Sequence, residues 1–348
     1  MSYNSPSIPS QVSGDGSSLH NEHQAVLLSE TVAALLGEKS LKKLSQKPTG
    51  IYVDATFGRG GHSRLLLSHL ADDARLIVFD KDPAAIAVAK ELAGLDNRVT
   101  VIHDSFATLS EQLSRLHIDK VTGLMADLGV SSPQLDDGSR GFSFMREGAV
   151  DMRMDTTRGQ PVSAWLETVD VDTLADVLYE FGEERHSRRI ARAIKEMDSY
   201  DSTLKLAEVI KTAHPNWQKG KHPATQSFQA MRIFINNELG DVDRFLQQSL
   251  EVLAPEGWLA VISFHSLEDR RIKQFLQRHS RGQYPEDENL PMPPVRPRYF
   301  GKPKRIGPSS AEIAMNPRAR SAWLRAAQRT DVVYDQHDQL ASQQHQNY

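Results

Sequence analysis

The hydrophobic positions in the first half of the chain form short runs that alternate with amphipathic stretches. Four apolar runs predict buried β-strands at residues 51–54, 76–80, 99–102 and 121–128. Apolar residues at helical spacing predict helices at 26–36, 63–70 and 83–92, with Ser29 as the expected N-cap of the first. Strands and helices that alternate in this way predict a mostly parallel, doubly wound sheet.

The second half departs from this alternation. Residues 136–159 predict a long structured loop, and helical patterns follow at 171–181, 185–197 and 204–213, the last capped by Thr203. The alternation resumes with a helix expected at 227–253 and a strand at 258–264. We therefore expect a helical insertion within an α/β domain. The expected division is a disordered extension (1–22), the first part of the α/β domain (23–137), a helical insertion with a substrate-facing loop (138–226), the second part (227–330) and a flexible tail (331–348).

Composition narrows the class of protein. The 348 residues include no cysteine, which excludes disulfides, thiolate nucleophiles and cysteine-ligated metal sites. No apolar run approaches the roughly 20 residues that span a bilayer. The polar N-terminus lacks the pattern of a secretory signal peptide. We expect a soluble, cytoplasmic protein.

The net charge of −4 conceals an uneven distribution of charged residues. Residues 295–329 contain nine basic side chains and one acid, Glu312, which suits either a solubilising tail or a contact with nucleic acid. A second basic pattern lies at helical spacing in the predicted insertion, at Arg185, Arg188, Arg189 and Arg192. This stripe either pairs with Glu183 and Glu184 or contacts phosphate groups.

The first predicted strand runs into a glycine-rich loop, DATFGRGGHS, from Asp54 to Ser63. The glycines lack the G-x-G-x-x-G spacing of dinucleotide-binding loops, and Asp54 would repel a pyrophosphate. Asp80 ends the second strand about 20 residues further on, where a carboxylate accepts hydrogen bonds from ribose hydroxyls. S-adenosylmethionine, which carries a ribose, a sulfonium and an amino group, meets these requirements.

The fourth predicted strand ends in DLGVSSPQLD, from Asp127 to Asp136. The carboxyl ends of central strands form the ligand crevice in an open α/β sheet. Methylation of an exocyclic amine requires hydrogen-bond acceptors beside the nitrogen, because its lone pair is delocalised into the ring. The Ser132-Pro133 turn followed by Gln134 offers a backbone carbonyl and a side-chain amide for this role, although an ordinary turn has the same composition.

Five further motifs accompany these two loops in order: RGFSF from Arg140, DMRMD from Asp151, HPATQSFQ from His222, SFHSLED from Ser263 and NPRAR from Asn316. In this combination, from about residue 23 to 329, the sequence closely resembles the bacterial RsmH (MraW) family, which methylates N4 of a cytosine in 16S ribosomal RNA. The resemblance implies a Rossmann-like class I S-adenosylmethionine-dependent methyltransferase fold with an inserted all-helical domain.

The resemblance also implies the residues of the site. The implied cofactor contacts are Gly60, Gly61, His62, Asp80, Phe106, Asp127 and Gln134. The implied catalytic residues are Asp127, Ser132, Pro133 and Gln134. The implied partner is 16S ribosomal RNA within the small ribosomal subunit. Independently of the resemblance, no His, Asp and Glu cluster shows metal-ligand spacing and no apolar run is long enough to span a bilayer, so we expect neither a metal nor a membrane.

Several assignments stay open at this point. No aromatic residue follows Pro133, unlike in related amino-methylating enzymes, which leaves Phe142 and Phe144 as candidates either for stacking on the base or for core packing. His265 suits either a general base or a structural hydrogen bond. The acceptor of the amine proton is unassigned.

Two other functions compete with the one that the resemblance implies. The first is the same chemistry on DNA or a free nucleotide. The second is a non-catalytic ribosome-assembly factor built on a methyltransferase scaffold, against which the intact glycine loop, Asp80 and Asp127 argue. A nicotinamide oxidoreductase is disfavoured by the glycine spacing.

Overall fold

The computed structural model of the chain describes residues 25–215 and 222–335, apart from residues 283, 285, 286, 288, 289 and 293. The predicted disordered extension and most of the predicted flexible tail lie outside these residues. Within the described ranges, no helix is both long enough and apolar enough to cross a membrane.

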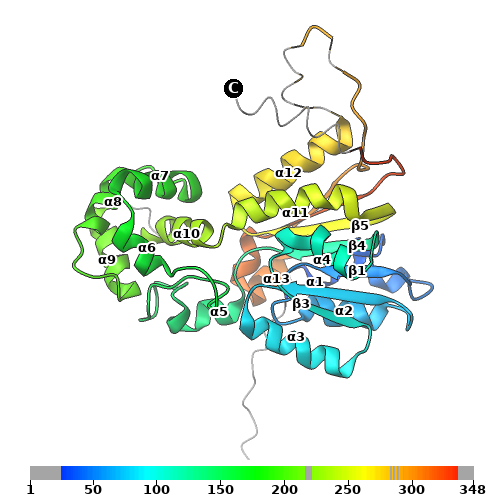
Figure 1. Ribbon diagram of the computed structural model, residues 1–348, viewed down its shortest axis with the longest axis horizontal. Coiled ribbons are helices and arrows are strands. Elements are labelled where there is room, and N and C mark those ends of the chain that lie inside the picture. Colours follow the sequence, from blue (N-terminus) through cyan, green and yellow to red (C-terminus); the bar gives the residue numbers. More distant parts are fainter. Residues whose placement is uncertain are drawn as a thin grey trace, which may run out of the picture.

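A seven-stranded sheet with the order β3-β2-β1-β4-β5-β7-β6 forms the centre of the larger lobe (Figure 1). The strands are β1 (Ile51–Asp54), β2 (Arg75–Asp80), β3 (Val99–His103), β4 (Val121–Asp127), β5 (Leu253–Ser263), β6 (Lys304–Ile306) and β7 (Trp323–Gln328). Strands β1 to β5 are parallel, whereas β7 is antiparallel to both of its neighbours. The predicted doubly wound α/β fold is confirmed, and its strand order reverses between β1 and β4.

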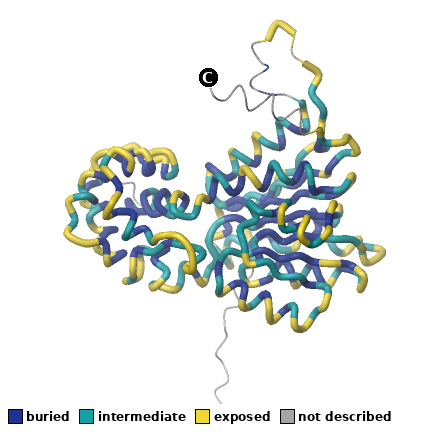
Figure 2. The backbone as a smooth tube through the Cα atoms, in the orientation of Figure 1, coloured by how far each residue is buried: buried dark blue, intermediate teal, exposed yellow. Residues whose placement is uncertain are grey.

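Helices cover both faces of the sheet. The helices on one face are α4 (Leu109–Arg115), α11 (Glu238–Val252) and α12 (Ser266–Arg281), and those on the other are α1 (Leu28–Leu35), α2 (Gly61–His69) and α3 (Pro83–Leu95). Because side chains alternate along a strand, Val53 packs with Phe245 on the first face and Tyr52 packs with Leu35 on the second. The strands are accordingly the most buried part of this lobe (Figure 2).

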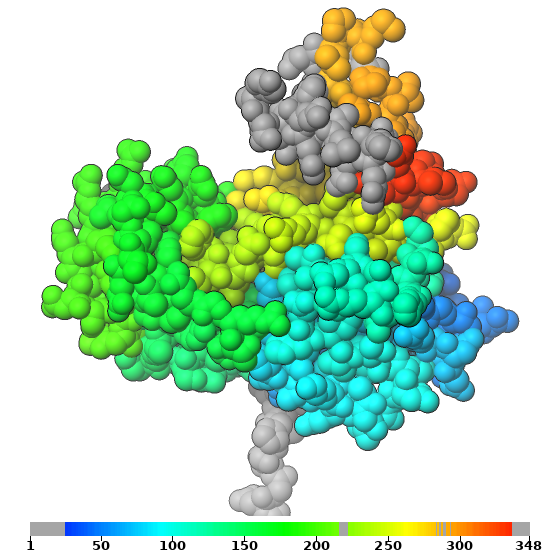
Figure 3. Space-filling view, viewed as in Figure 1, coloured from blue at the N-terminus to red at the C-terminus, as the bar shows by residue number. Residues whose placement is uncertain are grey.

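The second lobe is helical and has a hydrophobic core of its own (Figure 3, green). Its helices are α6 (Val162–Thr168), α7 (Val171–Gly182), α8 (Ser187–Lys195), α9 (Thr203–Ala213) and α10 (Ala224–Ile235). On α8, Ile190, Ala191 and Ile194 are buried in this core. The remaining elements are α5 (Ser132–Asp136), α13 (Ser310–Met315) and the short 3-10 helices η1 (Leu41–Lys43), η2 (Phe106–Thr108), η3 (Gly138–Arg140) and η5 (Pro317–Ser321).

The single helix expected at 227–253 is two helices, because the chain breaks between α10 and α11. Asn237 adopts a left-handed conformation with φ of 51°, which asparagine tolerates better than most residues. The side chain of Asn236 accepts a hydrogen bond from the backbone N–H of Met154 and donates one to the carbonyl of Met152, both at 2.7 Å. Asn236, at the break between the two helices, therefore fixes the loop around residues 152–154, which precedes α6.

Two predicted helix caps are wrong by one or two residues. Thr203 is the first residue of α9, and the side chain of Ser202 caps this helix by accepting a hydrogen bond from Lys205 N–H at 3.1 Å. Ser29 lies inside α1, whose N-terminal boundary is Leu27 in a left-handed conformation. In both cases a residue one or two positions earlier has the non-helical backbone conformation after which the helix begins, and sequence alone does not reveal that conformation.

Much of the basic segment 295–329 is structural, since it forms β6 and β7. Arg325 forms a bidentate ion pair with Asp269, through two hydrogen bonds of 2.6 and 3.0 Å. Arg329 is buried and donates to the carbonyls of Tyr299 and Val332. Neither of the two roles weighed for this segment, a solubilising tail or a contact with nucleic acid, fits Arg325 and Arg329, whereas Arg318 and Arg320 are exposed.

We expect Arg325→Ala to lower the free energy of unfolding by about 2 kcal/mol, because the largely buried carboxylate of Asp269 would lose its partner. Arg320→Ala is the matched control, since Arg320 is exposed, and it should change this free energy by less than about 0.5 kcal/mol. Urea unfolding of both variants measures the difference. Equal stability losses would contradict the structural role of Arg325.

Candidate active site

A cavity of about 1000 Å³ opens at the carboxyl ends of β1, β2 and β4. Residues of the glycine-rich loop, of the loop after β4, and of α10, α11 and α12 line it. Its position matches the crevice where the strand order of an open α/β sheet reverses, and its size suits a ligand the size of a nucleoside derivative.

The glycine-rich loop shapes one wall of this cavity. Gly58 has a left-handed φ of 56° and donates its backbone N–H to Oδ2 of Asp80 at 2.7 Å. Gly61 lines the cavity at the start of α2. Gly60 is not part of the lining; a Cβ there would lie 2.6 Å from the ring of Phe57. Gly60 therefore allows the loop to pack against that ring.

Two aspartates end neighbouring strands at the site: Asp80 lines the cavity, whereas Asp54 is buried beside it and is not part of the lining. Asp54 is buried at the end of β1 and accepts hydrogen bonds from the Ser63 hydroxyl at 2.6 Å and from Thr56 N–H at 3.1 Å. Asp80 ends β2 and accepts from the backbone N–H groups of Gly58 and Asp82. Burial raises the pKa of each carboxyl to about 6 despite these hydrogen bonds.

Asp127 ends β4 and faces the same cavity. Its Oδ1 atom is shielded from solvent and has no hydrogen-bond partner among the described residues. Oδ2 lies 3.7 Å from Nδ1 of His62, which is buried on α2. Burial raises the pKa of Asp127 well above its usual value, and the carboxyl groups of Asp54 and Glu268 raise it further.

The side chain of Gln134 is buried in a network that connects α3 and α5. Its Oε1 accepts from Ser131 N–H at 2.8 Å, and its Nε2 donates to Oδ2 of Asp82 at 2.7 Å. The same Asp82 oxygen accepts from Arg140 at 2.8 Å, while Oδ1 caps α3 through Ala84 N–H. Gln134 lines the cavity, but both ends of its amide already hold neighbouring elements in place.

The open turn that the sequence predicts at Ser132-Pro133 is the first turn of α5. Pro133 suits the start of a helix because its missing N–H has no partner there. The carbonyls of Ser131 and Pro133 accept hydrogen bonds from Leu135 and Asp137 along the helix. Ser132 and Pro133 both line the cavity, yet the carbonyl of Pro133 is already engaged.

The aromatic residues divide between the site and the cores. Phe106 lines the cavity and packs edge-on against Phe245 with ring centroids 5.4 Å apart. Phe142 is buried in the core of the helical lobe, and Phe144 stacks on His222 at 4.6 Å. Neither lines the cavity, so of the two roles weighed for these rings the structure favours core packing. Phe264, after β5, lines the cavity and is half-buried.

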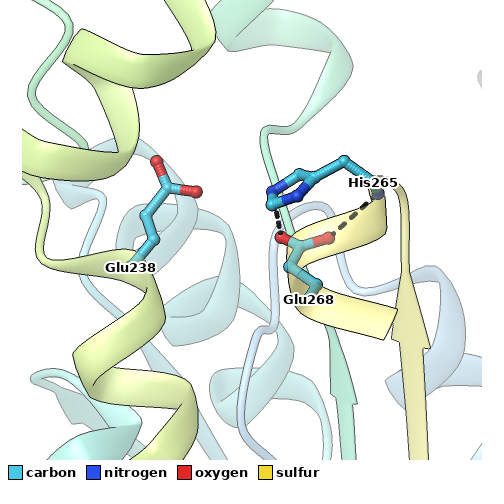
Figure 4. Close-up of side chains that lie close together, drawn as sticks. All are labelled: Glu238, His265 and Glu268. Carbon is cyan, nitrogen blue, oxygen red and sulfur yellow. Dashed lines mark hydrogen bonds and ion pairs between the residues drawn. The ribbon is translucent and has the colours of Figure 1, made fainter. Parts of the chain in front are cut away.

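A cluster that the sequence does not reveal joins three helices at the wall of the cavity (Figure 4). A carboxylate oxygen of Glu238 on α11, one of Glu268 on α12 and a ring nitrogen of His265 lie within 4.8 Å of one another. Figure 4 shows the three side chains close together. Arg232 on α10 donates two hydrogen bonds to Glu238, each 2.8 Å long, so the guanidinium balances that charge. Burial acts to raise the pKa of Glu268, but His265 and Arg232 hold it below its usual value.

His265 occupies a fixed place in this cluster. Its Nε2 lies 3.1 Å from Oε1 of Glu268, out of line for a hydrogen bond, and its backbone N–H donates to the other carboxylate oxygen at 3.3 Å. His265 is not among the residues that line the cavity. Of the two roles weighed for it, the structure favours the structural one. The sequence gives no signal for the cluster except the S-F-H-S-L-E-D motif, because Arg232 and Glu268 lie far apart along the chain.

Known proteins resemble this chain along almost its whole length. A family model for the MraW methylase family matches residues 20–330. A protein of Psychrobacter cryohalolentis named ribosomal RNA small subunit methyltransferase H is 74% identical over 333 residues, which cover 94% of this chain and 97% of that protein. A protein of the same name from Acinetobacter baumannii is 52% identical over 309 residues, covering 89% of this chain and 98% of that protein.

Among solved structures, a ribosomal RNA methylase from Streptococcus thermophilus aligns over 87% of this chain and 93% of its own, with 10% identity and a TM-score of 0.37. The family match and the two sequence relatives show the family of this chain. The chain is a member of the MraW methylase family.

Proposed function

We propose that this protein is an S-adenosylmethionine-dependent methyltransferase that methylates the N4 amino group of a cytosine in 16S, small-subunit ribosomal RNA. The observation that carries the proposal is the acidic cavity at the strand ends, in a chain 74% identical to a protein named ribosomal RNA small subunit methyltransferase H. The relative's name supports the small-subunit RNA substrate. The N4 position rests on the resemblance of the sequence motifs to the RsmH family.

The carboxyl groups of the cavity suit a cofactor that carries both a ribose and positive charge. Asp80 lies where its oxygens can accept from ribose hydroxyls, and Phe106 offers a ring for the adenine. Asp127 lines the cavity, and Oδ1 of its carboxyl group has no hydrogen-bond donor among the described residues, so its negative charge would stabilise a sulfonium or an amino group bound there. When bound, S-adenosylmethionine supplies an electrophilic methyl group.

The protein's own contribution to the reaction is mainly positioning. A cytosine in folded RNA must be extruded to reach the cavity, and Phe264 at its wall offers a face for stacking. Asp127 is the acceptor best placed to orient the amino group, since its side chain lines the cavity and is 27% exposed. Ser132, Pro133 and Gln134 form the adjacent wall, where Gln134 holds the α5 segment in place.

Two groups of exposed arginines suit the phosphate backbone of the RNA. Arg59, Arg64 and Arg318 line the mouth of the cavity and are exposed. The four-arginine stripe of the helical lobe, Arg185, Arg188, Arg189 and Arg192, is exposed too, and none of the four forms an ion pair with a described residue.

The alternative partners considered for the stripe are engaged elsewhere. Glu183 pairs with Arg270 at 2.9 Å, and Glu184 is buried. We therefore assign RNA binding to the helical insertion (138–226) and to the exposed part of the basic segment. The RNA would be bound in the cytoplasm, as part of the small ribosomal subunit.

Methyl transfer to defined substrates tests this function. With labelled cofactor, we expect methylation of small ribosomal subunits or 16S RNA, recovered as N4-methylcytidine by mass spectrometry, and none of duplex DNA or free nucleotides. Asp80→Ala should abolish transfer, because the ribose would lose its carboxylate partner. Labelling of DNA alone would contradict the RNA substrate, and failure to bind the cofactor in calorimetry would favour the non-catalytic assembly factor.

Replacing all four arginines of the stripe by alanine should raise the KM for RNA at least 10-fold and leave cofactor affinity unchanged. Each lost phosphate contact should reduce the slope of log affinity against log salt by about 1. The matched control is Lys205→Ala with Lys211→Ala on α9, because these lysines already pair with Asp201 and Glu208. An equal effect of both variants, or no effect of the first, would contradict the assignment.

A further inference from the structure

Asp127 is the carboxyl group of the cavity whose charge is least compensated. Its Oδ1 has no hydrogen-bond partner among the described residues, whereas Asp54 and Asp80 each accept at least two hydrogen bonds. The groups that face Asp127 are Asp54 from β1, Glu268 from α12 and His62 from α2. Two of these three are carboxyl groups, which disfavour a second negative charge.

His62 presents a second acceptor atom to Asp127, at 3.7 Å and so beyond hydrogen-bond distance. Its Nε2 lies 3.1 Å from the carbonyl of Val26, so this nitrogen carries the ring proton. Burial lowers the pKa of His62 to about 4, and the ring is therefore neutral with a lone pair on Nδ1. That lone pair faces Oδ2 of Asp127 at 3.7 Å. Two acceptors that face each other repel unless one of them carries a proton.

We propose that Asp127 accepts the proton that leaves the nucleobase amine, and that a cationic ligand beside it weakens its hold on a proton. This inference rests on the proposed function and deepens it, because it assigns the proton acceptor and links the charge of Asp127 to the charge of the cofactor. Burial and the two neighbouring carboxyls raise the pKa of Asp127, in agreement with this geometry.

The step balances in atoms and charge. The N4 lone pair forms the new N–C bond as the S–C bond breaks, and the electrons of the S–C bond stay on sulfur, which becomes a neutral thioether. The positive charge is then on the amine, whose N–H electron pair returns to nitrogen as the proton moves to the Asp127 carboxylate. A carboxylate beside a sulfonium before the step becomes a carboxylic acid beside a thioether after it, so the site keeps its net charge.

The same reasoning predicts that the two forms of the cofactor bind with different numbers of protons. S-adenosylmethionine and S-adenosylhomocysteine differ only in the methyl group and the positive charge of the sulfur. Binding of the cationic form should expel the proton of Asp127 into solution, whereas binding of the neutral form should leave it in place. Because Asp127 ionises in the free protein as pH rises, this difference should shrink with increasing pH.

Titration calorimetry of the full chain, repeated in buffers of different ionisation enthalpy, counts these protons directly. Across a pH series we expect S-adenosylmethionine to release more protons than S-adenosylhomocysteine, by up to about one proton. In Asp127→Asn the difference should fall to near zero. Asp137→Asn is the control: this exposed carboxyl has its pKa lowered by hydrogen bonds from Ser139, so it is ionised with either ligand and the difference should persist.

The outcomes separate the two levels of the proposal. Equal proton release by both ligands in the wild-type protein would overturn the inference without any variant, and so would a difference that persists in Asp127→Asn. If neither ligand binds the wild-type protein, the proposed function itself fails. Circular dichroism of both variants establishes that they are folded as the wild type is.

Discussion

The fold brings carboxyl groups from three neighbouring strands and one helix close together, and the function depends on how their charge is compensated. Asp80 and Asp127 end β2 and β4 and line the cavity with Glu268 of α12, whereas Asp54 ends β1 and is buried beside the cavity. Parallel strands place their carboxyl ends at one edge of the sheet, so this convergence follows directly from the topology. Such a group of acids is unstable while all are ionised, and a cationic ligand relieves the repulsion.

The helical lobe is fixed to this acidic site by polar side chains. Arg140 reaches Asp82 at the start of α3 and also donates to the carbonyls of Arg153 and Met154. Asn236 holds Met152 and Met154, and Arg232 joins α10 to α11 through Glu238. These contacts give the loop between α5 and α6 a defined position beside the cavity. A substrate bound by the helical lobe is thereby held at a set distance from the reacting atoms.

The parts of the fold that follow from local periodicity could be predicted from sequence. The strands at 51–54, 76–80 and 99–102 match β1 to β3 within one residue, because buried parallel strands are continuous apolar runs. Strands β6 and β7 were not predicted, since Pro-rich and basic composition conceals them. Arg325 and Arg329 read as charged surface residues, yet their partners, Asp269 and the carbonyls near Tyr299, become neighbours only after folding.

The residues of the candidate site likewise could be predicted from the sequence only in part. Asp54, Asp80 and Asp127 were identified because each ends a strand, and strand ends converge in this topology. The partners of Gln134 and His62 could not be predicted, because Asp82 and Val26 approach them through tertiary packing. The cluster of Arg232, Glu238, His265 and Glu268 likewise combines residues from three helices, with spacing in sequence that indicates no common site.

The central claim is that this chain transfers a methyl group to one cytosine of small-subunit ribosomal RNA. Mass spectrometry of 16S RNA from cells that lack the protein tests it most directly, with the gene restored in parallel. The account predicts that a single N4 methyl group on one cytosine disappears and returns on restoration. An unchanged set of cytosine modifications in the RNA of those cells would contradict it.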